Sequence, residues 1–254
     1  MRFASLGSGS RGNSTLVEHN NDCLMVDCGF SVKDSVRRLH RLGKTPEDIT
    51  AILVTHEHSD HWKGVLPLAV KYSINIYMTA GCLKGAKANL SDYRGIRLID
   101  SHRCFNIGEI EVKPVPVPHD AREPVQYIFS NSHHQLGILT DIGSITPYVR
   151  AEYHECDALL IEANHDINML RNGDYPKFLK DRVGSQWGHL NNKQTASLIE
   201  SLAQNRLQHL VIAHISQRNN NIERVKSQIE PIFKGTGTIH YACQNQGFDW
   251  LQLC

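Results

Sequence analysis

The sequence lacks the features that mark several classes of protein. Its seven cysteines are odd in number and scattered, and none forms a C-x-x-C pair, so they do not indicate a disulfide framework. It has no run of eighteen apolar residues, and its first ten residues, MRFASLGSGS, contain no apolar core of a secretory signal. We therefore expect reduced thiols in a cytoplasmic protein with no membrane partner.

The chain also has little net charge. Its formal charge is +1, which excludes a bulk positive field that attracts nucleic acid, so polyanion binding must come from a local patch or a metal. With 254 residues, 41% of them hydrophobic, it is long enough to bury one large core, and we expect a single domain over 1–254. Histidine is abundant, with fifteen copies, and histidine is the commonest metal ligand.

Three glycines near the start of the chain have the spacing of a dinucleotide-binding loop. Gly7, Gly9 and Gly12 lie in LGSGSRGNST, but such a loop holds a phosphate only where a helix follows it. Here two short apolar runs follow, separated by the turn residues 19–22. The glycines therefore open a β-hairpin, and the pattern argues against a dinucleotide site.

Hydrophobic periodicity predicts strands and helices in two successive runs. The first half has expected strands at 2–6, 14–19, 23–27, 51–55, 76–79 and 96–100, with helices over 33–42 and 62–72. The second half has strand-like segments including 157–162 and 209–214, with helices near 146–155, 191–204 and 221–233. Two sheets packed face to face with helices outside, a four-layer αββα sandwich, fit this order.

The sharpest motif is THEHSDHWKG, which follows the apolar strand 51–55. It gives H-x-H-x-D-H-x-x-G with His56, His58, Asp60 and His61. Two imidazoles at i and i+2 of an extended segment point to the same side and can share a cation, while a following turn directs Asp60 and His61 to a second one. The motif is not that of a zincin, which would need a histidine at position 60.

A loop this short cannot complete two metal sites, so other strand ends must contribute ligands. The candidates are His119 after PVPVP, Asp141 after GILT and His214 after LVIA. Each follows a β-rich apolar run, which places it at the end of a strand where loops gather.

This order of residues resembles the metallo-β-lactamase fold superfamily, whose architecture is the αββα sandwich. The resemblance implies that His56, His58 and His119 bind a first divalent metal, that Asp60, His61 and His214 bind a second, and that Asp141 bridges them. It implies that Asp27 orients the histidine loop from behind. An aspartate at 141, where classical lactamases have a cysteine, argues against lactamase activity.

Further motifs resemble the phosphodiesterase branch of the superfamily. GHLNN contains His189, followed by an expected helix and by His214-Ile-Ser-Gln-Arg218, and His189 could protonate a leaving 3′-oxygen. ASLGSGSRGNST, LLIEANHDINML and AHIS together resemble the YycJ/WalJ family over nearly the whole chain. That resemblance implies a metal-dependent nuclease that acts on DNA as an exonuclease.

The expected chemistry is attack on phosphorus by a water that two metal ions activate, with Asp60 and His189 as catalytic residues. Zinc and manganese both suit these ligands. Two other functions stay open: a metal-dependent hydrolase of a lactone or thioester, and a non-catalytic metal-binding sensor module. In the first of these, His189 would be dispensable.

Two segments are candidates for contacting the substrate. The glycine loop offers Ser8, Ser10 and Asn13 to a substrate phosphate. The segment 165–187 carries four cationic and three acidic side chains, and reads equally well as a solvated helical face or as a strand-contacting lid. In it, Tyr175 and Trp187 are candidates for base stacking or for core packing.

Overall fold

The computed structural model describes residues 1–86 and 93–254, which form two compact units. Unit 1 comprises Met1–Pro116, Ala121–His133 and Cys243–Cys254. Unit 2 comprises Val117–Asp120 and His134–Ala242. A single domain over 1–254 stays a prediction, and the units are described one at a time.

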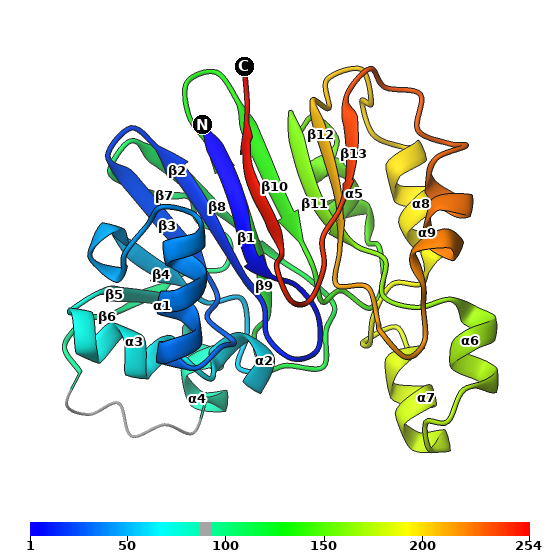
Figure 1. The fold of residues 1–254 in the computed structure, drawn as a ribbon, viewed down its shortest axis with the longest axis horizontal. Coiled ribbons are helices and arrows are strands. Elements are labelled where there is room, and N and C mark those ends of the chain that lie inside the picture. The colour runs from blue at the N-terminus through cyan, green and yellow to red at the C-terminus, as the bar shows by residue number, and fades with distance from the viewer. Residues whose placement is uncertain (87–92) are drawn as a thin grey trace. The chain divides into compact units, whose positions relative to one another are not determined.

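Unit 1 is built on a seven-stranded sheet whose order is β14-β1-β2-β3-β4-β5-β6 (Figure 1). The strands from β14 to β3 are antiparallel, and those from β3 to β6 are parallel. The predicted hairpin after the glycines is confirmed, because Leu16 pairs with Met25. The strands are β1 (Arg2–Gly7), β2 (Ser14–His19), β3 (Asp22–Val26), β4 (Ala51–Leu53), β5 (Asn75–Thr79), β6 (Ile96–Ile99) and β14 (Phe248–Gln252).

Short helices connect the parallel strands of this sheet. In α1 (Val32–Arg41), Ser31 Oγ accepts a hydrogen bond from Asp34 N at 3.3 Å, and Gly43 follows the helix at φ +69°, the left-handed turn that glycine adopts freely. Leu39 of α1 enters one buried core with Ile52 of β4 and Leu68 of α3. The others are η1 (Pro46–Asp48), α2 (Ser59–Trp62), α3 (Val65–Tyr72) and α4 (Ala80–Gly85).

Three further strands of unit 1 form an antiparallel ladder. They are β7 (Phe105–Ile107), β8 (Ile110–Pro116) and β9 (Val125–Ser130). The first half of β8 alternates as a half-buried strand does, since Ile110 and Val112 are buried while Glu111 is exposed.

Unit 2 contains four parallel strands in the order β10-β11-β12-β13. Their bounds are β10 (Gln135–Leu139), β11 (Ala158–Glu162), β12 (His209–Ala213) and β13 (Thr238–Tyr241). Every residue of β11 is buried, as expected for a strand covered on both faces. The helices are α5 (Pro147–Tyr153), α6 (Ile167–Asn172), α7 (Lys177–Val183), α8 (Asn192–Glu200) and α9 (Ile222–Ile229).

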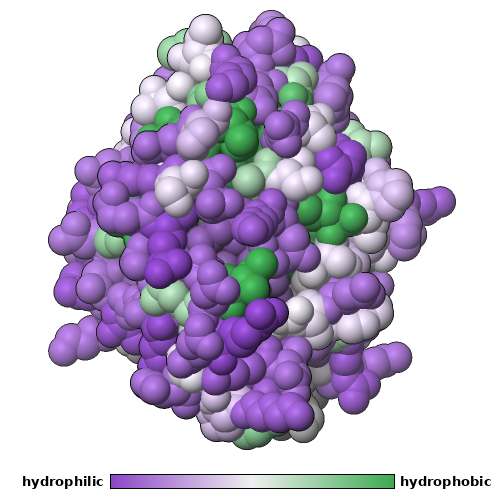
Figure 2. Space-filling model, turned by 90° about the vertical axis from the view of Figure 1, so that its right-hand side faces the viewer, coloured by the Kyte–Doolittle hydropathy of each residue, from purple (hydrophilic) through white to green (hydrophobic). Residues whose placement is uncertain are grey.

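The side of the molecule that carries α6 to α9 is mainly hydrophilic, with separate apolar groups (Figure 2). Phe178 and Trp187 are 73% and 60% exposed, so Trp187 does not pack in the core. Across the described ranges, no helix has the length and apolar character needed to cross a membrane.

The buried strands of unit 2 should dominate its stability. Leu160 of β11 is 2% exposed, whereas Leu98 of β6 is 58% exposed. We expect Leu160→Ala to lower the free energy of unfolding by about 2–5 kcal/mol, because it leaves a cavity among packed side chains. Leu98→Ala, the matched control, should change it by less than about 1 kcal/mol. Urea unfolding followed by circular dichroism measures both, and equal losses would contradict the assignment of β11 to the core.

Candidate metal and catalytic site

The histidine motif of unit 1 lies where β4 ends and α2 begins. His56 and His61 are buried, and their rings lie 4.2 Å apart between centroids. His56 Nε2 lies 3.0 Å from His58 Nδ1, so two ring nitrogens converge on one point. Asp60 follows in the first turn of α2, with a carboxylate oxygen 3.6 Å from His61 Nε2. The structure therefore brings together the four residues of the motif within unit 1.

Asp27 lies behind this loop, at the end of β3. Its carboxylate accepts hydrogen bonds from Thr55 N at 2.8 Å and Thr55 Oγ1 at 2.7 Å, and contacts His61 Nδ1 at 2.7 Å. Burial raises the pKa of Asp27, while the neighbouring His61 opposes that shift. Its backbone has φ +59°, which is unusual for a residue other than glycine. Asp27 thus contacts a histidine of the loop, and its role in orienting that loop stays a prediction.

The glycine loop packs directly against the histidine motif. Asn13 N donates to Asp60 O at 2.8 Å, and the Asn13 side-chain amide lies 3.0 Å from His61 Nε2. Gly29 is needed beside it, because a Cβ there would lie 1.8 Å from Asp60 O. Ser8 and Asn13 are buried and Ser10 is exposed. Contact of these three side chains with substrate stays a prediction.

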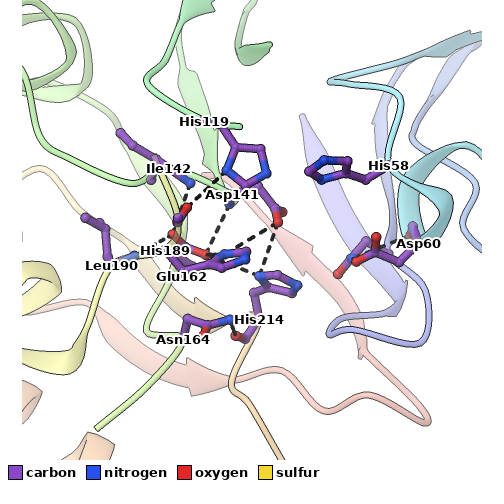
Figure 3. A network of polar contacts seen from close by, with 12 residues as sticks. His58, Asp60, His119, Asp141, Ile142, Glu162, Asn164, His189, Leu190 and His214 are labelled. Atoms are coloured by element: carbon purple, nitrogen blue, oxygen red, sulfur yellow. Dashed lines mark hydrogen bonds and ion pairs between the residues drawn. The ribbon is translucent and has the colours of Figure 1, made fainter. Parts of the chain in front are cut away.

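Unit 2 holds a second cluster, centred on the buried carboxylate of Glu162 at the end of β11 (Figure 3). One oxygen of Glu162 lies 3.1 Å from His189 Nδ1 and 3.2 Å from His214 Nδ1. The other accepts hydrogen bonds from Ile142 N at 3.0 Å and Leu190 N at 2.9 Å. Asp141 Oδ1 lies 3.6 Å from the Nδ1 atoms of both histidines.

Electrostatics keep Glu162 ionised. Burial alone opposes the charged form, but His189 and the hydrogen bonds from both histidines outweigh it and lower the pKa of Glu162 to about 2. Four side chains of this cluster offer ligand atoms within 4.8 Å of one another, namely Asp141, Glu162, His189 and His214.

His119 also belongs to unit 2. It is 2% exposed, its Nδ1 lies 3.0 Å from Gly188 O, and its ring lies 5.3 Å from that of His189. The predicted ligands Asp141 and His214 have φ +53° and +50°, so strained backbone recurs where each strand ends. Among the described residues other than glycine, five have positive φ, and three of these are predicted site residues, which is the distribution expected of a functional site.

Four of the predicted imidazole ligands have an oxygen atom at Nδ1, whereas Nδ1 of His58 lies 3.0 Å from His56 Nε2. Nδ1 of His56 lies 2.9 Å from Thr55 Oγ1, and Nδ1 of His61, His119 and His214 lies against Asp27, Gly188 O and Glu162. A carboxylate or carbonyl at Nδ1 fixes the tautomer that presents a lone pair at Nε2, which is how metal-binding histidines are commonly oriented. The nitrogen and oxygen atoms in both units thus suit a divalent metal ion.

Known proteins with similar sequences identify the superfamily to which this chain belongs. Residues 23–215 match the model of the beta-lactamase superfamily domain. The chain belongs to the beta-lactamase superfamily. It is 33% identical over 93% of its length, and 90% of the relative's, to exodeoxyribonuclease YycJ of Bacillus anthracis. It is 35% identical to exodeoxyribonuclease WalJ of Streptococcus pneumoniae, over 86% of this chain and 83% of the relative.

Among solved structures, the metallo-beta-lactamase fold protein YhfI of Bacillus subtilis superposes with a TM-score of 0.76 at 15% identity, and 99% of each chain is covered. This likeness shows that the chain has the metallo-β-lactamase fold, and confirms the αββα sandwich predicted from the sequence. The predicted resemblance to the superfamily and to the YycJ/WalJ relatives is confirmed as well.

The sequence analysis does not single out Glu162, which it places only as the last residue of the expected strand 157–162. An acidic side chain directly after Leu159, Leu160 and Ile161 was the available signal, because a carboxylate that ends a fully buried strand must have partners.

Replacing Glu162 should therefore disturb both histidines at once. We expect Glu162→Gln to weaken Zn²⁺ binding by about 10-fold or more, because the amide has one acceptor oxygen and its NH₂ group faces groups that need an acceptor. Competition with a chromophoric chelator measures the affinity. Glu200→Gln, on the exposed face of α8, is the control, and equal affinities for the two variants would contradict the role of Glu162.

Replacing Asp27 should likewise weaken metal binding by the histidines of unit 1. Asp27→Asn retains the size and tolerates positive φ, but loses the charge against His61, so we expect Zn²⁺ affinity to fall by about 10–100-fold. The melting temperature should fall as well, because buried hydrogen bonds to a charged group are lost. Asp249→Asn is the surface control, since the Asp249 side chain is 85% exposed. An unchanged affinity in Asp27→Asn would show that Asp27 does not orient the loop.

Proposed function

We propose that this chain is a metal-dependent nuclease that hydrolyses phosphodiester bonds at the ends of DNA strands. The observation that carries the proposal is the 33–35% identity, over most of the chain, to relatives named exodeoxyribonuclease. The ligand sets of the two units support it, because they provide imidazole and carboxylate groups held for metal binding.

We propose that the two sets act together as one di-metal centre in a single catalytic domain. His56, His58 and His119 would bind the first ion and Asp60, His61 and His214 the second, with Asp141 between them, as the order of motifs implies. Zinc or manganese would serve. Bound divalent ions supply Lewis acidity and lower the pKa of a water, which makes it a nucleophile at neutral pH.

His189 is the proposed general acid. Its side chain is 19% exposed, so it is more open to a ligand than the buried Glu162 that contacts its Nδ1. The carboxylate at Nδ1 stabilises the protonated ring, which places a transferable proton at Nε2. That proton would pass to the leaving oxygen of the cleaved phosphodiester.

The glycine loop is proposed to contact the substrate backbone through Ser8, Ser10 and Asn13. Ser10 is the exposed member of the three, whereas the Asn13 amide already contacts the histidine loop. We also infer a cytoplasmic location, supported by seven cysteines that form no disulfide.

Nuclease assays on end-labelled single-stranded and duplex DNA, with Mn²⁺ or Zn²⁺, test the proposal. We expect Asp60→Ala to abolish cleavage, because it removes a metal ligand. His189→Ala should lower kcat by about 10²–10⁴-fold, the usual contribution of a general acid. His102→Ala, at a side chain that is 72% exposed, should cleave like the wild type.

Two outcomes would contradict the proposal. Cleavage that survives Asp60→Ala would exclude the two-metal account. Turnover of a lactone or thioester with no DNA cleavage, unaffected by His189→Ala, would identify a hydrolase of small carbonyl substrates instead, and metal binding without any turnover would identify a sensor.

A further inference from the structure

Unit 2 contains a cavity of about 470 Å³ that none of the proposed catalytic residues lines. Residues of α6 and α7, which are neighbours in Figure 1, form its walls together with His165 and Asn191. The volume exceeds that of a phosphate ion and suits a ligand of nucleotide size, since ligand pockets begin at about 300 Å³.

The cavity gathers positive charge. Arg171, Lys177 and Lys180 line it with one carboxylate, Asp181, so three cations and one anion leave two net positive charges. Lys180 Nζ donates to Arg171 O at 3.0 Å, which holds its ammonium group at the wall. The protein as a whole has a net charge of only +1, so the excess of positive charge in the cavity wall is a local feature.

Other charges of the segment 165–187 are engaged away from the cavity. The Asp166 carboxylate accepts hydrogen bonds from Asn168 N at 3.0 Å and Met169 N at 2.9 Å, at the start of α6. Arg182 pairs with Asp120. Of the seven charged residues of the segment, four line the cavity, namely Arg171, Lys177, Lys180 and Asp181, whereas Asp166, Asp174 and Arg182 are not among its lining residues.

His165 contributes a buried ring nitrogen that lacks a hydrogen-bond partner among the described residues. The residue is one of those that line the cavity, it is only 2% exposed, and the nitrogen without a partner in the described part of the chain is its Nδ1. Burial lowers the pKa of His165 to about 4, so the ring is neutral at physiological pH and has both a donor and an acceptor nitrogen. Buried polar atoms without partners are uncommon, and a bound ligand is one way to satisfy them.

The cavity lies close to the Glu162 cluster along two chain segments. His165 is three residues beyond Glu162, and Asn191 is two beyond His189. The segments are bonded to each other, because Asn164 N donates to Leu190 O and Asn192 N donates to His165 O, both at 3.0 Å. Three residues span at most about 11 Å, so the backbone of His165 lies within that distance of Glu162, and that of Asn191 lies closer still to His189.

We propose that this cavity binds the terminal phosphate monoester of the strand being degraded. The inference rests on the proposed nuclease function. A terminal monoester carries about −1.5 to −2 charges at pH 7, against one for an internal phosphodiester, and so matches the two net positive charges better. Lys177 and Lys180 bind the phosphate, and Ile167 and Leu170 pack against the terminal sugar and base.

Binding and cleavage of matched oligonucleotides test this inference. Short, internally labelled single-stranded DNAs carry a phosphate at the 5′ end, at the 3′ end or at neither. Fluorescence anisotropy in the presence of EDTA, which prevents cleavage, measures the affinity of the wild-type protein for each DNA. We expect one of the phosphorylated forms to bind about tenfold more tightly than the hydroxyl form, because one charge-assisted hydrogen bond contributes about that much to affinity. With Mn²⁺ the protein should cleave that form at a lower KM.

Lys180→Gln and Lys177→Gln should remove that preference and leave the affinity for hydroxyl-ended DNA nearly unchanged. Lys234→Gln is the matched control, because Lys234 Nζ also donates to a backbone carbonyl, that of Pro231, at an exposed site of unit 2. Circular dichroism confirms that each variant is folded.

The outcomes separate the inference from the nuclease proposal. Wild-type protein that cleaves DNA but treats phosphate and hydroxyl ends alike would overturn the inference alone, as would variants that weaken binding to all three DNAs equally. Wild-type protein that prefers a phosphorylated end yet cleaves nothing would overturn the nuclease proposal while supporting the cavity's role.

Discussion

The contact on which the site depends is a buried carboxylate against Nδ1 of an imidazole. Asp27 supports His61 in unit 1, and Glu162 supports His189 and His214 in unit 2. Each carboxylate also accepts backbone N–H groups, from Thr55 in one case and from Ile142 and Leu190 in the other. These hydrogen bonds compensate for the loss of water around a buried charge. The carboxylate can therefore orient a ring without destabilising the folded protein.

The strands explain why both carboxylates lie where they do. Asp27 follows β3 in unit 1 and Glu162 ends β11 in unit 2, and each strand pairs in parallel with a neighbour in its own unit. The backbone turns sharply there, with positive φ at Asp27, Asp141 and His214. Packing of the strands behind these residues holds them in conformations that a free chain would seldom adopt.

Most of the strands were predictable because the hydrophobic period is strong in them. The hairpin before Val26 and the buried strands at 51–53, 158–162 and 209–213 were all expected. The elements that the sequence does not predict, such as β13 and β14, bury none of their residues, so their apolar side chains show no core-facing period. The H-x-H-x-D-H loop was predictable because its ligands are neighbours along the chain. Glu162 was missed because its partners, His189 and His214, lie 27 and 52 residues away.

The sequence by itself determined the ligand types, the strands that carry them and the superfamily, because these depend on residue identity and local spacing. Only the tertiary structure decided which ring nitrogen His61, His119 and His214 present, since the group at Nδ1 comes from a residue 34, 69 or 52 positions away. It also decided that the lysines of α7 face a cavity with His165, while Asp166 and Arg182 find partners elsewhere. A count of charges along a segment cannot show this, because side chains close in sequence on a helix point in different directions.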